Sequence, residues 1–156
     1  MININIVCVG NLKESYWQDA VKEYQKRISA FAKISVIEVK ESTYGTSTKE
    51  ILLAKNAEAK RLEPYKKGYC IALEVGGKSY DSLTFANHIN DIATKGNSTI
   101  TFFIGGSHGL DKDFSDSADE KISFSKFTFP HQMMRVILLE QTYRAFTILN
   151  NKTYHK

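Results

Sequence analysis

The chain has 156 residues, of which 42% are hydrophobic and 24% are charged, and its net charge is +4. This length fits one domain with its own hydrophobic core, and the composition is that of a globular protein, which excludes a disordered or fibrous chain. No apolar run approaches the roughly 20 residues of a membrane-spanning helix, and residues 1–10 lack the features of a signal peptide, so we expect a cytoplasmic protein without a membrane partner. The mild basic excess is compatible with a nucleic-acid partner and does not require one.

Strand and helix patterns alternate along the first half of the chain. Alternating apolar residues predict a strand over residues 2–9. Apolar positions three and four apart predict an amphipathic helix from Glu14 to about Ala30. β-Branched residues predict a second strand over Lys33–Val39. A polar loop then leads to a helix over Thr48–Leu62, which stops before Pro64.

The same alternation continues in the second half. A third strand is predicted over Tyr69–Val75, closed by two glycines, and a helix capped by Asp81 or Ser82 runs to about Thr94. Thr99–Ile104 is the fourth predicted strand. An acidic segment, Asp111–Asp119, predicts a short helix, and Lys121–Phe124 a short fifth strand. The pattern predicts one α/β domain over residues 1–156, with a mostly parallel sheet flanked by helices.

The last predicted helix, His131–Leu149, is apolar on nearly all sides. A single sheet covers only about one face of a helix, so we expect the remaining apolar surface to meet a second copy of the chain in a homodimer. The residues after this helix, NKTYHK, are predicted to form a free tail.

Ligands of open parallel sheets bind beyond the carboxyl ends of the strands. In this chain those ends are Val75–Gly77, the turn Gly105–Gly109 and the loop after Phe124, so three candidate loops are expected along one edge. The glycine turn could cradle a phosphate, but it matches neither the P-loop nor the GxGxxG pattern, and a purely structural turn is equally compatible with it.

Two further segments each allow a functional and a structural interpretation. Phe124–Phe129, directly before Pro130, is either a strand with a rigid turn or a loop whose backbone groups bind an adenine edge. In the tail, Tyr154 could stack on a base, His155 could accept a proton and Lys156 could hold a phosphate.

The remaining reactive residue types favour structural roles. Cys8 and Cys70 lie in apolar strand patterns and are interpreted as buried hydrophobic residues. Glu140 and Arg144 are four apart on a helix, which is typical of an intrahelical ion pair. No HxH, HExxH or Cys/His cluster occurs, so no metal site is expected.

Taken together, the segments FFIGGSHGL, SFSKFTFPHQMMRVILLEQTYRAF and TYHK closely resemble the ribosomal RNA large subunit methyltransferase H family, small methyltransferases of the SPOUT class. The resemblance spans the whole chain and implies an α/β domain with a C-terminal trefoil knot, which forms an S-adenosylmethionine site. It also implies a homodimer that methylates N3 of a pseudouridine in a stem-loop of 23S ribosomal RNA, within the assembled ribosome.

Site residues follow from the same resemblance. The residues implied to contact the cofactor are Leu73, Gly105, Phe124, Ser125, Lys126, Phe127, Thr128 and Phe129. Arg144, Tyr154 and His155 match residues that hold and activate the nucleotide, with His155 as the expected base. Three alternatives stay open: a methyltransferase acting on another RNA base, a non-catalytic RNA-binding module of ribosome assembly, and a nucleotide-phosphate binder that uses the glycine turn.

Overall fold

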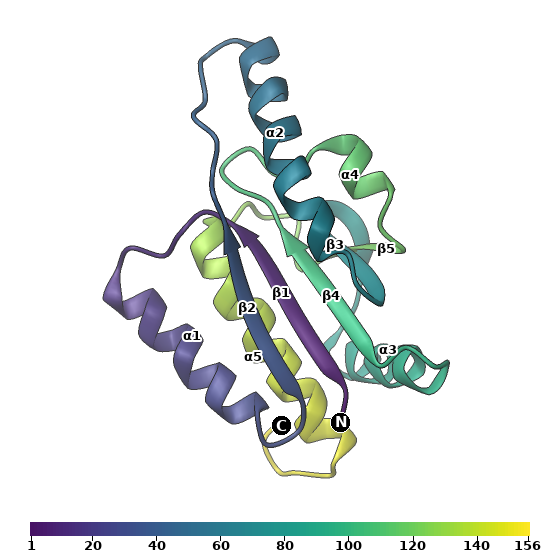
Figure 1. Ribbon diagram of the computed structural model, residues 1–156. Helices are drawn as coiled ribbons and strands as arrows, with labels where there is room; N and C mark the ends of the chain where they lie inside the picture. Colours follow the sequence, from purple (N-terminus) through teal and green to yellow (C-terminus); the bar gives the residue numbers. More distant parts are fainter.

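The computed structural model describes residues 1–156, in which strands and helices alternate as the sequence predicted (Figure 1). The strands are β1 (Asn3–Val9), β2 (Lys33–Val39), β3 (Tyr69–Ser79), β4 (Thr99–Ile104) and β5 (Glu120–Ser123). The helices are α1 (Ser15–Ile28), α2 (Thr48–Leu62), α3 (Ser82–Thr94), α4 (Lys112–Asp116) and α5 (His131–Leu149), with a short 3-10 helix, η1 (Glu63–Tyr65), after α2. The predicted α/β class is confirmed.

All five strands belong to one parallel sheet with the order β2-β1-β4-β3-β5. β1 lies between β2 and β4, and its first residue, Asn3, pairs with Lys33 on one side and Thr99 on the other. Because parallel strands end on the same side, the segments after β1, β2 and β4 all leave the upper edge of the sheet in Figure 1. This edge is where ligands of such sheets bind.

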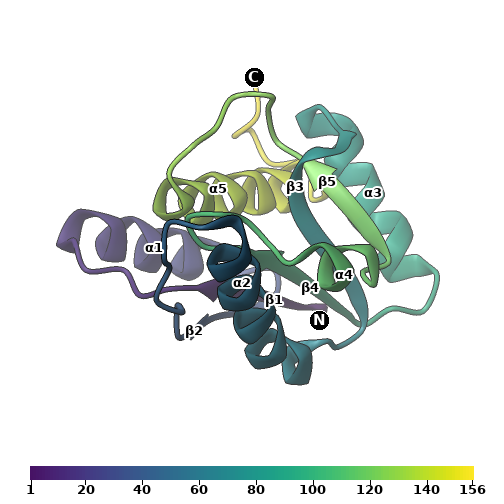
Figure 2. The same ribbon diagram turned by 90° about the horizontal axis from the view of Figure 1, so that it is seen from above.

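Helices cover both faces of the sheet (Figure 2). Ile4 and Ile6 of β1 share a core with α1, α3 and α5, whereas Val7 and Val9 share a second core with α2 and α4. The strands are therefore apolar on both sides, as a parallel sheet between two helix layers requires. Within its layer α5 packs against both α1 and α3.

This packing accounts for much of the apolar surface of α5. Phe146 stacks on Phe31, with ring centroids 6.1 Å apart, and Tyr143 lies against the same ring at 6.3 Å. Met133 and Ile137 stay partly exposed. The apolar composition of α5 is thus satisfied largely within the chain, and the homodimer stays a prediction. No helix combines the length and apolar character needed to cross a membrane.

β3 continues through Gly76 and Gly77, where the sequence predicted its end. Its pairing with β5 shifts register between Leu73 and Lys78. A Cβ atom on Gly77 would lie 2.7 Å from backbone atoms of Ile122, so the missing side chain is what lets the two strands approach. The glycine pair is therefore part of an irregular strand.

Two further boundaries differ from the prediction. α4 covers residues 112–116 instead of 111–119, because Asp111 is its cap, accepting a hydrogen bond of 3.1 Å from the backbone N–H of Phe114. β5 covers residues 120–123 instead of 121–124, which leaves Phe124 in the following loop.

Candidate active site

A cleft of about 920 Å³ lies at the carboxyl edge of the sheet. Four segments line it: the end of β3, the glycine turn after β4, the loop after β5 and the first turn of α5. Its volume falls within the roughly 300–1,000 Å³ of cofactor and small-molecule sites. The three segments that the sequence placed along one edge do meet at this cleft, which confirms their position, although Val75 and Gly76 belong to β3 instead of a loop.

The glycine turn is folded so tightly that side chains are excluded from it. A Cβ atom on Gly105 would lie 2.4 Å from the backbone carbon of Gly109. Gly109 has a φ of +80° and donates a backbone hydrogen bond of 3.0 Å to Gly106. Glycine is the residue that tolerates both the positive φ and the close approach. The turn thereby brings bare backbone to the wall of the cleft.

The loop 124–130 has no regular secondary structure and closes the opposite wall. Its conformation is held locally, because the Ser125 hydroxyl accepts a 3.0 Å hydrogen bond from the backbone N–H of Phe127, whose side chain is exposed. The segment is a loop, so its interpretation as a strand is wrong, and binding of an adenine edge by its backbone groups stays a prediction. Seven of the eight predicted cofactor-binding residues line the cleft, namely Leu73, Gly105, Phe124, Ser125, Phe127, Thr128 and Phe129, and Lys126 does not.

The segment between β2 and α2 supports the glycine turn from outside the cleft. A Glu41 oxygen accepts hydrogen bonds from the Ser107 hydroxyl at 3.1 Å and the Ser107 backbone N–H at 3.5 Å. The ring of Tyr44 packs on His108, with centroids 4.5 Å apart. The sequence predicts only a polar loop here and gives no sign of these contacts.

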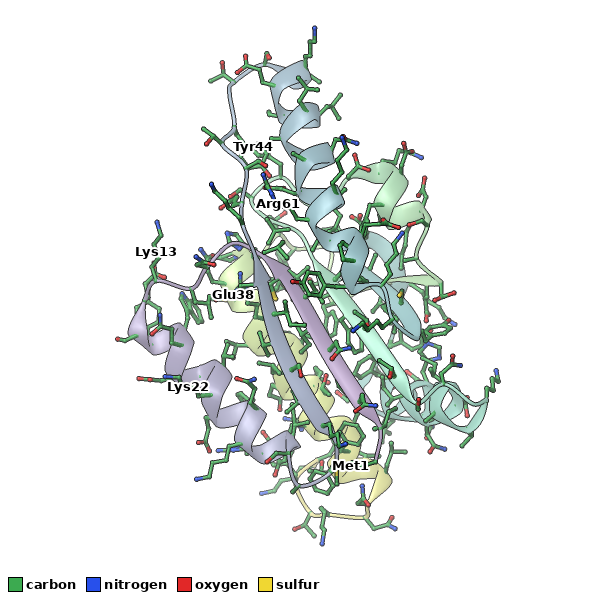
Figure 3. All side chains as sticks on the ribbon, in the orientation of Figure 1. Met1, Lys13, Lys22, Glu38, Tyr44 and Arg61 are labelled. Carbon is green, nitrogen blue, oxygen red and sulfur yellow. The ribbon has the colours of Figure 1, made fainter.

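A buried carboxylate on α2 holds that segment in place. Glu58 accepts hydrogen bonds from the Ser42 backbone N–H at 2.9 Å and from the Tyr44 hydroxyl at 2.7 Å. Burial, together with the hydrogen bond to Glu58, raises the pKa of Tyr44. Arg61 donates to the carbonyl of Lys40 at 2.9 Å and to the Ser42 hydroxyl at 2.7 Å. Figure 3 shows Tyr44 and Arg61 together at this junction.

Under the first turn of α5, the fully buried Arg135 ties three elements together. Its guanidinium donates to Glu38 at 2.6 Å and to the carbonyls of Val9 and Gly10 at 3.2 and 2.6 Å. The Glu38 carboxylate also accepts from the backbone N–H of Leu12 at 2.8 Å. A buried charge needs such partners. Arg135 therefore fixes the start of α5, and with it one wall of the cleft.

A second polar cluster lies at the other end of α5 and contains all three predicted catalytic residues. Arg144 donates to Glu140 through Nη2 at 2.5 Å and through Nε at 3.1 Å, which confirms the expected ion pair. The Tyr154 hydroxyl donates to the same Glu140 oxygen at 3.1 Å, and the Arg144 guanidinium lies 4.7 Å from the Tyr154 ring centroid. Burial, followed by the bond to Glu140, raises the pKa of Tyr154 to about 12.

The tail is therefore folded back onto α5. The prediction of a free tail is wrong. Nη1 of Arg144 lies 3.2 Å from Nδ1 of His155. A guanidinium has only donors, so Nδ1 must accept this hydrogen bond and the neutral ring carries its proton on Nε2. Tyr143 packs edge-on against Tyr154, at 4.8 Å between centroids. Glu140 is the residue that could have indicated this fold-back, because its carboxylate accepts hydrogen bonds from Arg144 on the helix and from Tyr154 in the tail.

Within one chain the cleft and the Glu140 cluster are not brought together. The cleft involves α5 only up to Met134, and the cluster begins at Glu140 and centres on Arg144. Met134 and Arg144 are ten residues apart on α5, which corresponds to about 15 Å of rise along the helix. Figure 1 accordingly shows the C-terminus at the lower edge of the sheet, opposite the carboxyl edge where the cleft lies.

The other titratable residues form local contacts. His88 pairs with Glu120 at 2.5 Å and stacks on Tyr80. The two cysteines are unpaired and buried, and burial raises the pKa of Cys8 to about 12. No group of three or more His, Cys, Asp or Glu side chains is arranged to hold a metal ion.

Comparison with known proteins identifies full-length relatives. A family model described as "Predicted SPOUT methyltransferase" matches residues 2–155. Proteins named "Putative ribosomal RNA large subunit methyltransferase H" from Methanococcus maripaludis and Methanococcus vannielii are 48% and 45% identical to this chain over 159 residues. Each alignment covers 99% of this chain and 100% of the relative.

Solved structures share the fold. A probable methylase family protein from Haemophilus influenzae Rd KW20 matches with a TM-score of 0.58 over 98% of this chain and 70% of its own length. The two sequences are 13% identical, so this likeness concerns the fold alone.

Proposed function

The chain belongs to the ribosomal RNA large subunit methyltransferase H family of SPOUT methyltransferases, and from this premise we propose that it transfers a methyl group from S-adenosylmethionine to N3 of a pseudouridine. The proposed substrate is a stem-loop of 23S ribosomal RNA within assembled ribosomes in the cytoplasm. Relatives that cover the whole chain carry the name of a ribosomal RNA methyltransferase, which supports this substrate class.

The cleft is the proposed cofactor site, and its residues fit that role. The turn at Gly105 offers backbone with no side chain in the way, and the loop 124–129 offers backbone N–H and carbonyl groups beside aromatic rings. These groups suit an adenine edge better than a triphosphate, because no lysine or arginine lines the cleft. When bound, S-adenosylmethionine supplies the electrophilic methyl carbon of a sulfonium ion.

The pair formed by Arg144 and His155 is the observation that carries the choice of substrate. An imide such as N3 of pseudouridine presents an N–H group beside a carbonyl oxygen. Nη1 of Arg144 is a donor and Nδ1 of His155 is an acceptor, and the two atoms lie 3.2 Å apart. Without RNA they satisfy each other. With RNA, we propose, Nη1 donates to the carbonyl and Nδ1 accepts the N3 proton.

Each residue of the cluster then has a defined task. Nδ1 of His155 removes the N3 proton, and the Arg144 guanidinium stabilises the negative charge that spreads onto the carbonyl oxygen. Glu140 holds the guanidinium through two of its nitrogens, and Tyr154 covers its face. Tyr154 also offers an aromatic surface on which a base can stack.

The distance between cleft and cluster supports a composite site. Since α5 separates them within one chain, we propose a homodimer in which the cluster of one subunit lies over the cleft of its partner. The partly exposed Met133 and Ile137 on α5 are available for this interface. We also propose that the C-terminal residues around the cleft form the trefoil knot of the family.

The experiment that tests this function follows labelled methyl groups from S-adenosylmethionine into whole ribosomes, separated subunits and naked ribosomal RNA, with base-resolved mapping of the product. We expect label at N3 of one pseudouridine in the large-subunit RNA of assembled ribosomes. Label on another base would favour the alternative RNA methyltransferase. Cofactor binding without any transfer would favour a non-catalytic assembly module, and binding of ATP or NAD instead of S-adenosylmethionine would favour a phosphate binder.

His155→Ala provides the internal control for the mechanism. Removing the proposed base should lower turnover by about 100-fold or more while the Kd for S-adenosylmethionine stays within about twofold. Unchanged turnover would remove His155 from the mechanism and leave the substrate assignment to the mapping.

A further inference from the structure

A groove of about 440 Å³ runs beside the Glu140 cluster, between the end of α1, the second half of α5 and the tail. Its lining includes the aromatic rings of Phe31, Tyr143 and Tyr154 and the cations of Arg27 and Lys152, and none of its lining residues is acidic. The groove is separate from the cofactor cleft, with which it shares no residue. It does share Tyr154 with the proposed catalytic cluster.

Arg27 is held in a fixed orientation with donors left over. Its Nε donates to Glu23, one helical turn earlier, at 2.9 Å, while its side chain stays 40% exposed. The guanidinium carbon lies 5.4 Å from the ring centroid of Tyr24 and 5.7 Å from that of Tyr143. Nη1 and Nη2 donate to no other protein group. A guanidinium oriented by a carboxylate and two rings, with free Nη groups, is suited to bind a phosphate in a bidentate manner.

From this combination we propose that the groove binds the nucleotide next to the one that is methylated. Arg27 and Lys152 bind its phosphate, and its base stacks against the aromatic wall formed by Phe31 and Tyr143. Unpaired RNA is commonly recognised by bases stacked on aromatic side chains beside cations that track the backbone. Tyr154 lines the groove and also belongs to the proposed catalytic cluster, so the groove adjoins the proposed position of the target nucleotide. This inference rests on the proposed function and adds a substrate subsite to it.

The test compares Arg27→Ala and Lys152→Ala with Lys22→Ala, which removes a cation from α1 outside the groove (Figure 3). Methyl transfer to ribosomes is measured at several monovalent salt concentrations and constant magnesium. We expect Arg27→Ala to raise KM for ribosomes about tenfold and to reduce the slope of log KM against log salt by about 0.7 to 0.9, as loss of one phosphate contact predicts. Lys22→Ala should stay within about twofold of the wild type.

Two readouts separate a binding role from a structural one. The Kd for S-adenosylmethionine and the melting temperature should not change in Arg27→Ala, and Arg27→Lys should recover part of the salt slope because it keeps the charge. If Arg27→Ala unfolds, Lys152→Ala tests the same groove, since Lys152 is exposed and outside both cores. The groove proposal would be overturned if the wild type is active and both alanine variants keep its KM and its salt slope. Absence of methyl transfer by the wild type would overturn the proposed function instead, and direct ribosome binding by the same variants would then still test the groove.

Discussion

The hydroxyl of Tyr44 donates a 2.7 Å hydrogen bond to the carboxylate of Glu58, a residue that is only 2% exposed. Through Tyr44 and its neighbours, this carboxylate on α2 fixes the segment that contacts the glycine turn at Ser107 and His108. The shape of the proposed cofactor cleft thus depends on a residue that does not line it.

Glu58→Gln should therefore weaken cofactor binding from a distance. The amide oxygen can still accept from the Ser42 N–H, but the NH₂ group then faces Tyr44, whose hydroxyl must turn and accept, so both hydrogen bonds to a charged carboxylate are lost. We expect a loss of stability of roughly 1–3 kcal/mol and a Kd for S-adenosylmethionine raised about tenfold. Calorimetric titration and thermal melting measure the two effects. Glu63→Gln, at an exposed carboxylate just after α2, is the matched control and should change neither.

Gly105→Ala should abolish the cofactor site more completely. The new methyl group would lie 2.4 Å from the backbone of Gly109, and backbone cannot yield as a side chain can. We expect destabilisation of roughly 2 kcal/mol or more and no measurable cofactor binding. Gly76→Ala is the comparison, since a Cβ there meets nothing within 4 Å and its melting temperature should match that of the wild type. Normal cofactor affinity in Gly105→Ala would show that the turn can relax.

The sequence predicted what depends on local pattern. Alternation, helical periodicity and glycines located the strands and the three segments that meet at the cleft, and the i,i+4 spacing of Glu140 and Arg144 predicted their ion pair. It did not predict contacts between segments far apart in the chain. Glu41 and Ser107 are 66 residues apart, so no periodicity relates them.

The tail shows the same limit at shorter range. Its composition suggested a free end, yet the Tyr154 hydroxyl and His155 find partners on α5. Spacing rules describe one helix, and they stop applying once the chain turns back after Leu149. The Arg27 groove could not be predicted from the sequence for the same reason, because α1, α5 and the tail form it together.

His131 should make the stability of the fold depend on pH. Burial is the main cause that lowers its pKa below 6.5, opposed by the charge of Glu41, and its Nδ1 is buried without a partner. The folded protein therefore binds this proton less readily than the unfolded chain does. Stability should rise as pH increases from the depressed pKa to about 6.5, and the effect of this residue should be constant above that value.

The measurement for His131 is the melting temperature between pH 5 and pH 8. His131→Asn removes the titrating group, so it should lose less stability than the wild type when the pH falls from 8 to 5. Gln132→Asn, which changes a neighbouring residue without a titrating group, should follow the wild type. An identical acid loss in His131→Asn would assign the pH dependence to other groups.

A composite active site predicts complementation between two inactive variants. Gly105→Ala disables the cleft and leaves the cluster of Arg144, Tyr154 and His155 intact, whereas His155→Ala disables the cluster and leaves the cleft intact. If the cluster of one subunit serves the cleft of its partner, a heterodimer of the two variants contains one complete site and one doubly defective site. Random exchange at equal concentrations yields heterodimers as half of all dimers, so about a quarter of wild-type activity should return on mixing.

The mixing experiment requires that the subunits exchange, which co-expression of the two differently tagged variants ensures. Tandem purification then isolates heterodimers alone, and their activity should approach about half that of the wild type, because one of the two sites is intact in each. Gly105→Ala co-expressed with a second cleft variant, Phe129→Ala, is the negative control, since that heterodimer holds no intact cleft. Inactive heterodimers of Gly105→Ala and His155→Ala would mean that cleft and cluster must come from the same chain, with the tail reaching its own cleft when RNA binds.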